Sequence, residues 1–372
     1  MYSRALEKQI RLDLKEKMVF LSGPRQSGKT TLAKSFLKKE GDSYFTWDDL
    51  EDRKIILKEQ LPTSSKLIIL DEIHKYKRWR GMLKGFYDKR KDNISIIVTG
   101  SAKLDYYRKG GDSLQGRYHH LRLYPFSFKE VSNQGGEFKD LFELSGFPEP
   151  FISGSKAKAK RWSNQYKERV LYEDLRDLEQ VKEINLLELL TLRLPELVGS
   201  PLSVNSLRED LSVSHQTISR YVDILERLYF LFRIYPFQSK YINAIKKEPK
   251  HYHFDWTTID DPAARFENLI GFHLLKETHF LKDITGKNRD LFYFRDIDLR
   301  EVDFVVTENN KPILFVECKL SDTGVDKNLR YLKTKFPDVG AVQVVNANSV
   351  DFINKDGIRV CSGDIFCKEL SI

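Results

Sequence analysis

The chain has 372 residues, of which 41% are hydrophobic and 31% charged, and its 62 Lys and Arg residues exceed its 54 Asp and Glu residues. This length predicts two to three domains, and the net charge of +8 permits a nucleic-acid partner without requiring one. Three cysteines without a CxxC pair argue against a disulfide framework or a zinc site. No apolar run approaches the length of a membrane span. We therefore expect a cytoplasmic protein with no membrane partner.

Short apolar strands alternate with helical stretches up to about Pro150, with strands expected at 18–21, 66–70 and 95–99. Such alternation predicts a parallel sheet with helices on its faces. A basic segment at 154–161 predicts a junction, after which the pattern is helical to about Tyr235 and then mixed beyond Lys250. The sequence therefore predicts three domains, 1–153, 154–245 and 246–372.

The run Gly23-Pro-Arg-Gln-Ser-Gly-Lys-Thr30 fits the phosphate-binding pattern G-x-x-x-x-G-K-[ST] and lies between an apolar strand and a helix-compatible run. Backbone N–H groups of such a loop surround phosphates, while Lys29 reaches the β- and γ-phosphates and the Thr30 hydroxyl holds Mg²⁺. A chance glycine turn is the alternative, but the order of strand, loop and helix argues against it. The predicted nucleotide-binding residues of the loop are Gly23, Pro24, Arg25, Gln26, Ser27, Gly28, Lys29, Thr30 and Thr31.

Two carboxylates, Asp71 and Glu72, follow the apolar run at 66–70. A buried strand that ends there places both groups at the carboxyl edge of the sheet, beside the phosphate loop. Asp71 is predicted to hold Mg²⁺ through its water shell, and Glu72 to polarise the attacking water. The alternative is a solvated acidic strand end, which the spacing from the phosphate loop makes less favourable.

Two further candidates follow the strand at 95–99. Thr99 or Ser101 could lie between the γ-phosphate and the carboxylates as a sensor of hydrolysis, although Thr-Gly-Ser also serves as a strand-ending turn. Arg117 could be an arginine finger, in its own chain or toward a neighbouring subunit; the alternative is a surface arginine on a loop.

An ordered set of motifs resembles the AAA-type ATPases common in archaea and bacteria. These motifs are GPRQSGKTTL (23–32), LDEI (70–73), VTGS (98–101), LQGR (114–117), YPFSFKE (124–130) and GFPEP (146–150). The resemblance covers nearly the whole chain. It implies ATP as the nucleotide, supports the roles given to Lys29, Thr30, Asp71 and Glu72, and makes Arg117 a reasonable candidate. It also implies a C-terminal domain similar to restriction endonucleases.

The middle region predicts a winged helix-turn-helix. A short helix at 202–211 precedes a second at 213–228, with Ser203 or Asn205 capping the first and Ser214 the second. One face of the second helix is apolar, and an apolar strand at 229–235 follows. Its exposed N-terminal face carries His215, Gln216, Ser219 and Arg220. These residues would suit double-stranded DNA; the alternative is a structural lid without nucleic acid.

Two strands near the C-terminus, at 299–306 and 313–319, are expected to form a hairpin. Glu317 and Lys319 alternate onto one face, and Asp303 is expected to meet Glu317 across the hairpin. Glu267, on a helix at 262–276, is a further predicted ligand. The order Glu267, Asp303, Glu317-x-Lys319 resembles the PD-(D/E)xK nuclease core, which implies Mg²⁺ or Mn²⁺ on the carboxylates with Lys319 assisting cleavage.

The predicted fold class is thus α/β, with an AAA-type P-loop domain, a helical and winged-helix middle domain, and a restriction endonuclease-like domain. Two functions remain open from the sequence. One is an ATP-driven, DNA-directed protein in which turnover gates a metal-dependent nuclease, and the other is an ATP switch that docks a protein partner and carries a passive nuclease-like platform. If Arg117 acts toward a neighbouring subunit, the chain would form a homo-oligomer.

Overall fold

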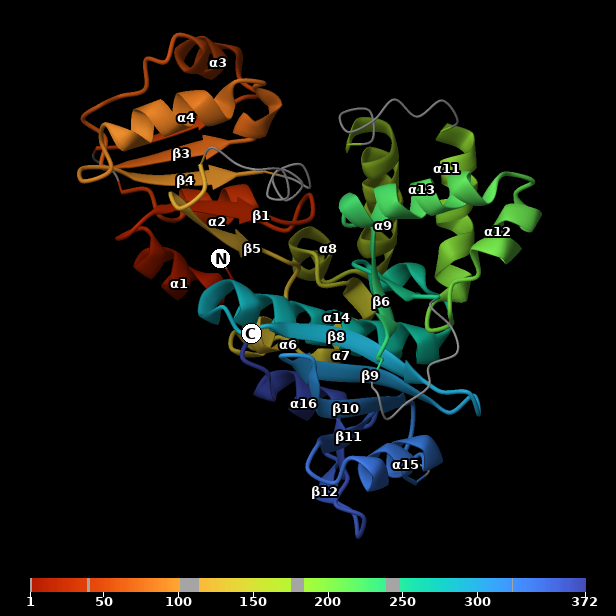
Figure 1. Cartoon of the computed structure of the whole chain (residues 1–372). Helices are drawn as coiled ribbons and strands as arrows, with labels where there is room; N and C mark the ends of the chain where they lie inside the picture. The colour runs from red at the N-terminus through yellow and green to blue at the C-terminus, as the bar shows by residue number, and fades with distance from the viewer. Residues whose placement is uncertain (1, 39–40, 101–113, 175–183, 239–247, 323) are drawn as a thin grey trace. The chain divides into compact units, whose positions relative to one another are not determined.

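The computed structural model describes residues 2–38, 41–100, 114–174, 184–238, 248–322 and 324–372. They fall into two compact units, Met1–Pro125 and Phe126–Ile372 (Figure 1). Within the described ranges, none of the helices combines the length and the apolar character needed to cross a membrane.

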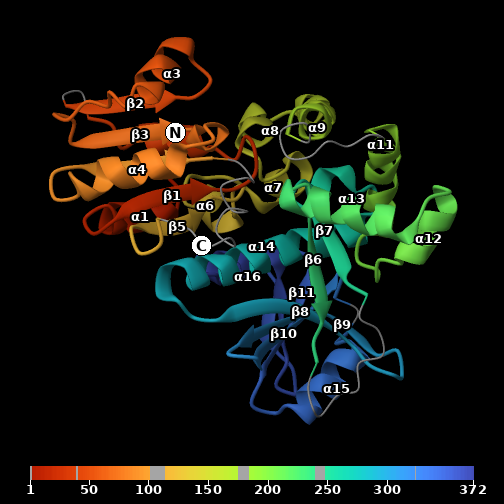
Figure 2. The ribbon, with the colours of Figure 1, turned by 45° about the horizontal axis from the view of Figure 1, so that its top comes forward.

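The first unit contains a parallel sheet. Its described strands lie in the order β2-β3-β4-β1-β5, and every neighbouring pair is parallel (Figure 2). The strands are β1 (Met18–Ser22), β2 (Asp42–Thr46), β3 (Leu67–Asp71), β4 (Ser95–Thr99) and β5 (Tyr118–Arg122). The helices are α1 (Leu6–Asp13), α2 (Lys29–Lys34), α3 (Leu50–Leu57), the 3₁₀ turn η1 (Ile73–Lys75) and α4 (Trp79–Asp88). The predicted parallel sheet is confirmed.

Helix α4 illustrates how this unit builds its core. Its buried side chains, Trp79, Met82, Leu83, Phe86 and Tyr87, recur at the three- and four-residue spacing of one helical face. That face joins the hydrophobic cluster formed by β1, β3 and β4. Because these strands are buried on both faces, they are almost continuously apolar, which is why the sequence pattern located them.

The second unit begins with helices. They are α6 (Phe128–Ser132), α7 (Phe138–Leu144), α8 (Pro148–Ser153), α9 (Lys156–Arg169), the π-helical turn η3 (Val170–Asp174), α11 (Ile184–Arg193), the 3₁₀ turn η4 (Leu194–Leu197), α12 (Val204–Asp210) and α13 (His215–Arg227). The later helices are the turn η5 (Trp256–Thr258), α14 (Pro262–Thr285), α15 (Lys327–Lys335) and α16 (Gly363–Glu369).

A mixed sheet completes the second unit, with the described order β12-β13-β11-β10-β9-β8-β6-β7. Its strands are β6 (Leu231–Pro236), β7 (Lys250–His253), β8 (Arg289–Arg295), β9 (Glu301–Glu308), β10 (Lys311–Lys319), β11 (Gly340–Val345), β12 (Asp351–Ile353) and β13 (Arg359–Ser362). Strand β6 lies in the segment predicted as the middle domain and pairs with β8 of the predicted C-terminal domain.

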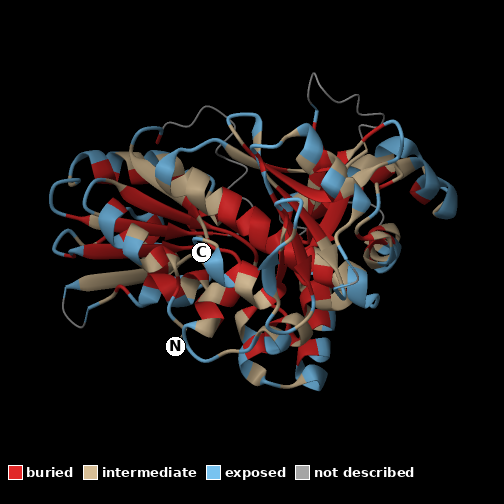
Figure 3. Cartoon of the chain, turned by 90° about the horizontal axis from the view of Figure 1, so that it is seen from below, coloured by how far each residue is buried: buried red, intermediate tan, exposed pale blue. Residues whose placement is uncertain are grey.

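Helix α14 lies along this sheet in both views (Figure 1, Figure 2) and is buried over most of its central turns. In Figure 3 the strands are mostly buried, and exposed residues lie mainly on helices and loops. Two polar side chains of α14, those of His273 and Lys276, are buried with partners. His273 Nε2 accepts a hydrogen bond from Phe128 N (2.9 Å), Nδ1 donates to Leu269 O (2.8 Å), and Lys276 pairs with Glu130. Burial lowers the pKa of His273 to about 4, so the ring is neutral.

Candidate functional site

Three strands of the first unit bring the predicted nucleotide residues to one edge of the sheet. Parallel pairing aligns Leu21 of β1 and Asp71 of β3 with Thr99 of β4, so these strands end together. The phosphate loop leaves β1 at this edge and enters α2 at Lys29. The spacing of strand, loop and helix therefore places the loop beside the carboxylates, as the sequence predicts.

The loop backbone requires glycine at its first position. Gly23 has φ of 142°, and a Cβ there would stand 2.2 Å from the carbonyl oxygen of Leu123. Gly28 also has a positive φ, of 94°, where the helix begins. The buried Lys29 side chain folds back over the loop, because its Nζ donates to Gly23 O (3.0 Å) and Pro24 O (2.6 Å). Its ammonium thus lies within the curve of the loop, where phosphate oxygens bind in such motifs.

Arg4, which precedes α1, supports the same loop and was not singled out in the sequence. Its buried guanidinium donates from Nη1 to Ser27 O (2.8 Å) and from Nη2 to Tyr124 O. Charge-assisted hydrogen bonds of this kind hold a backbone more firmly than neutral ones. No pattern around position 4 signals this role, since the partner carbonyls lie far along the chain.

Asp71 is the centre of a hydrogen-bond network at the sheet edge. Its Oδ2 accepts from Thr30 Oγ1 (2.9 Å) and from Tyr44 OH (2.7 Å), and its Oδ1 accepts from Thr99 Oγ1. Thr30 and Asp71, both predicted as magnesium residues, are therefore brought together. Their oxygens are the hard ligands that Mg²⁺ prefers, so this donor set fits the ion. Tyr44, on β2, is the member that sequence reasoning missed.

Glu72 follows Asp71 in a left-handed conformation, with φ of 54° and ψ of 23°. Its Oε2 lies 3.6 Å from His74 Nε2 and 3.7 Å from Lys75 Nζ, while Lys75 also pairs with Asp48 at 2.7 Å. Burial raises the pKa of Glu72, and Lys29 and Lys75 oppose that rise. A raised carboxylate pKa favours proton acceptance, which suits a group that activates water.

The remaining residues predicted for the nucleotide site do not lie together. Thr99 contacts Asp71, whereas Ser101 lies outside the described residues. Arg117 precedes β5, and Met18 N donates to its carbonyl oxygen (3.1 Å), so it stands at the sheet edge opposite the phosphate loop. There its Nε donates to Asp88 Oδ1 (2.6 Å). Within one chain, the structure does not bring Arg117 to the phosphate loop.

Helices α12 and α13 have the predicted caps and faces. Ser203 accepts from Ser206 N, and Ser214 accepts from Thr217 N. The apolar face of α13 is buried, while its first two turns expose polar side chains. The buried residues are Ile218, Tyr221, Val222, Ile224 and Leu225, with Leu228 following, and the exposed ones are His215, Gln216 and Arg220. Ser219 is half-buried.

Asp303 and Glu317 meet across β9 and β10 as predicted. Asp303 N donates to Glu317 Oε2 (3.3 Å), and Cys318 N donates to Asp303 Oδ2 (2.8 Å). Lys319 Nζ lies 2.6 Å from Glu317 Oε1 and 3.2 Å from Asp326 Oδ2. Burial, followed by the charge of Asp303, raises the pKa of Glu317 to about 9.

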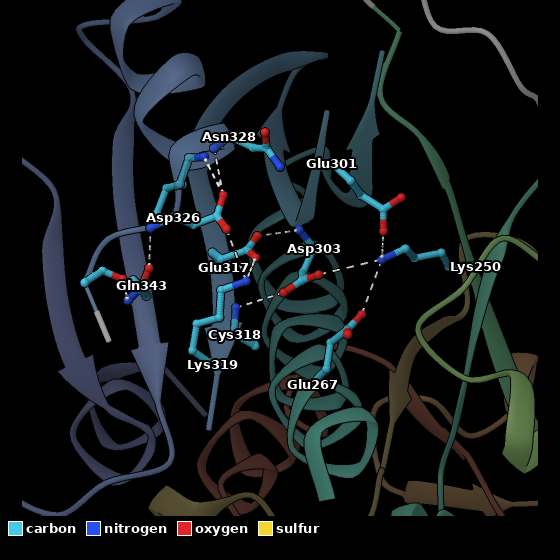
Figure 4. Close-up of polar contacts among 12 residues, drawn as sticks. Lys250, Glu267, Glu301, Asp303, Glu317, Cys318, Lys319, Asp326, Asn328 and Gln343 are labelled. Carbon is cyan, nitrogen blue, oxygen red and sulfur yellow. Dashed lines mark hydrogen bonds and ion pairs between the residues drawn. The ribbon is translucent and has the colours of Figure 1, made fainter. Parts of the chain in front are cut away.

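Lys250 enters the same region from β7 (Figure 4). Its Nζ lies 2.6 Å from Glu301 Oε1, 3.4 Å from Glu267 Oε1 and 3.7 Å from Asp303 Oδ1. Burial favours the neutral amine, but the three carboxylates outweigh it and raise the Lys250 pKa. Burial, followed by the charge of Asp303, raises the pKa of Glu267 to about 7.

The predicted nuclease residues are therefore neighbours, but they do not fit a divalent ion as they stand. The oxygens of Asp303 and Glu317 already face an ammonium or a backbone N–H group. Among the residues with described positions, no group of three or more His, Cys, Asp or Glu side chains is arranged to hold a metal ion. The nearest cation to Glu267 and Asp303 is an ammonium of the chain itself.

Comparison with protein families divides the chain into three matches. Residues 15–132 match an AAA domain, residues 135–257 match a domain of unknown function (DUF8612), and residues 263–363 match another (DUF4143). The AAA match, the phosphate loop and the parallel sheet together support a P-loop ATPase domain of the AAA type.

Curated relatives extend along most of the chain. A protein of Haemophilus influenzae is 23% identical over 91% of this chain and 91% of its own length. A protein of Methanocaldococcus jannaschii is 29% identical over 63% of this chain and 60% of its own length. Both are described only as uncharacterized proteins.

Among solved structures, Bacteroides Pif1 bound to ssDNA is similar over 39% of this chain and 45% of its own. The sequence identity is 14% and the TM-score is 0.26. A TM-score this low carries no information about the function of this chain.

Proposed function

We propose that the chain binds ATP at the phosphate loop and hydrolyses it with Mg²⁺. The observation that carries this proposal is the Asp71 network, in which Thr30 and Thr99 donate to one carboxylate beside Lys29. Lys29 exchanges its loop carbonyl partners for phosphate oxygens when ATP binds. Thr30 and Asp71 would hold the Mg²⁺, and the ion would neutralise phosphate charge.

Glu72 is the group that activates water in this proposal. Its carboxylate orients a water molecule toward the γ-phosphate and accepts a proton from it as the water oxygen bonds to the γ-phosphorus. The bond from that phosphorus to the β–γ bridging oxygen breaks, and ADP leaves. His74 and Lys75 lie close enough to hold the carboxylate in place. Thr99, at the end of β4, donates a hydrogen bond to the Asp71 carboxylate, and this position suits a sensor of the γ-phosphate.

Nucleotide titration calorimetry tests the binding step. Lys29→Ala should abolish measurable ATP binding, because the phosphates lose their closest cation. Lys8→Ala is the matched control, since Lys8 is an exposed residue of α1 and should leave affinity unchanged. Unchanged affinity in Lys29→Ala would remove the phosphate-loop assignment.

We further propose that ATP turnover is directed to double-stranded DNA through α13. Its first two turns expose His215, Gln216 and Arg220, which suit phosphates and base edges. His215→Ala with Arg220→Ala should weaken duplex binding and flatten its salt dependence, measured by fluorescence anisotropy. Arg227→Ala, at the far end of α13, is the control. If the double variant and the unaltered chain show the same salt dependence of duplex binding, the structural-lid alternative is favoured.

A second candidate is an ATP switch whose C-terminal domain is a passive platform for a partner. The favouring observation is Lys250, which occupies the carboxylate cluster expected to bind metal in an active nuclease. A nicking assay on duplex DNA with Mn²⁺, with and without ATP, separates this candidate from the ATP-gated nuclease that the sequence left open. Cleavage that Asp303→Ala removes would establish the nuclease.

Arg117 belongs to this proposal only as a residue supplied by a neighbouring copy, in a homo-oligomer. If it acts in that way, mixing Arg117→Ala with Glu72→Gln protein should restore partial ATP hydrolysis. A mixture with no more activity than its components would leave Arg117 with only its contacts inside its own chain, such as the ion pair with Asp88.

A further inference from the structure

Lys250 is buried to an extent rare for a lysine, with 1% of its side chain exposed. It starts β7, and its Nζ is the common neighbour of carboxylates from two other elements (Figure 4). Glu267 belongs to α14, whereas Glu301 and Asp303 belong to β9. One ammonium therefore joins three elements of the second unit.

Each of the three carboxylates has a further donor. Tyr252 OH donates to Glu267 Oε1 (2.7 Å), the oxygen that also faces Lys250. The second oxygens of the other two carboxylates are bonded as well, because Arg295 Nη1 donates to Glu301 Oε2 (2.9 Å) and Cys318 N donates to Asp303 Oδ2 (2.8 Å). A buried charge is tolerated when it is paired and hydrogen-bonded. Each of the three carboxylates meets both conditions, because it faces the ammonium and accepts a hydrogen bond from a further donor.

We propose that the Lys250 ammonium takes the place of a divalent cation in this cluster and neutralises the carboxylates from within the chain. A divalent ion would need several of these oxygens at roughly 2.0–2.6 Å, and the ammonium already lies 2.6 Å from one of them. Two cations at such separation repel strongly in a buried site. The cluster is thus an internal cross-link of β7, α14 and β9, and it binds no divalent ion and cleaves no phosphodiester by a metal-dependent route.

Removing the ammonium should convert the cluster into a metal site. Lys250→Met keeps an unbranched stem of similar length and leaves Glu267, Glu301 and Asp303 around the vacated position. Three carboxylates without a cation form a hard oxygen ligand set of the kind that Mn²⁺ or Ca²⁺ binds. The substitution should also lower the thermal stability of the chain in EDTA, because it leaves buried carboxylates uncompensated.

Mn²⁺ titration of the nucleotide-free full chain, followed by the free-ion paramagnetic resonance signal, tests the proposal. All proteins carry Asp71→Asn, which suppresses binding at the nucleotide site. The parent, which carries only Asp71→Asn, should bind no Mn²⁺ at millimolar concentration. Lys250→Met should bind one ion per chain with an affinity at least about tenfold above that millimolar limit. Adding Asp303→Asn should remove that ion. Lys319→Met is the matched control, because it removes the other lysine of the region without exposing Glu267 or Glu301.

Two results would overturn the proposal. One is Mn²⁺ binding by the parent that Asp303→Asn abolishes, since the ion would then share the cluster with Lys250. The other is a folded Lys250→Met protein that binds Mn²⁺ no better than the parent. If Lys250→Met does not fold, the parent and its Asp303→Asn variant still decide: equal, negligible binding supports the proposal, and binding that depends on Asp303 refutes it.

Discussion

Replacing Glu72 with Gln removes one titrating carboxylate at the sheet edge and keeps the size of the side chain. In the structure this carboxylate lies 3.6 Å from His74 and 3.7 Å from Lys75, and burial raises its pKa. An amide cannot accept the proton of the attacking water. Loss of a general base slows turnover by roughly 10²-fold or more, equivalent to about 2.7 kcal/mol of transition-state stabilisation. ATP affinity should stay near that of the unaltered chain.

Steady-state phosphate release and nucleotide calorimetry, run on the same protein, measure both effects. Asp48→Asn is the control, because it removes the other carboxylate that pairs with Lys75 and should change turnover by less than about twofold. Because a base must be ionised, the raised pKa of Glu72 should move the acid limb of the kcat profile above the usual carboxylate pKa near 4.5. Turnover by Glu72→Gln equal to that of the unaltered chain would refute this assignment of the base.

Three further predictions test the site and the core. Tyr44→Phe should lower the free energy of unfolding by about 1.5 kcal/mol, because Asp71 loses one of its donors; an unchanged midpoint in thermal unfolding would contradict this. Gly23→Ala should weaken ATP binding by at least about tenfold in calorimetry, since the new Cβ would overlap the Leu123 carbonyl; full affinity would show that the loop rearranges at little cost. His273 is neutral in the fold and has its pKa lowered to about 4, so its contribution to stability is present above pH 6.5 and is lost as the pH falls toward 4. In urea unfolding across this range, His273→Gln should reduce the pH slope by about 1.4 kcal/mol per pH unit, and an identical slope would refute a neutral buried ring.

Features with a local sequence signal were predicted well. The strands at 18–21, 66–70 and 95–99 lie within a few residues of β1, β3 and β4, because a buried parallel strand requires a continuous apolar run. Ser214 caps α13 as expected, since a capping serine acts on backbone only three residues away. Asp303 meets Glu317 as expected, but the turn alone does not set this pairing: a bulge between Pro312 and Leu314 shifts the hairpin register by one residue.

Features that depend on distant pairing were not predicted. Arg117 lies at the far edge of its sheet because β5 runs parallel to β1, and the mixed polar sequence of β5 gives no sign of that register. Tyr44 and Arg4 act on residues 27 and 23 positions away, where no periodicity connects them. Lys250 stands in a basic, polar segment that reads as exposed, and only its neighbours from α14 and β9 explain its burial.

The most direct test of the central claim is Mg²⁺-dependent release of phosphate from ATP by the purified chain. We predict steady release that requires Mg²⁺ and that Asp71→Asn reduces to background, because Asp71 organises Thr30 and Thr99 at the sheet edge. No release by the unaltered chain, or release that Asp71→Asn leaves intact, would contradict the account.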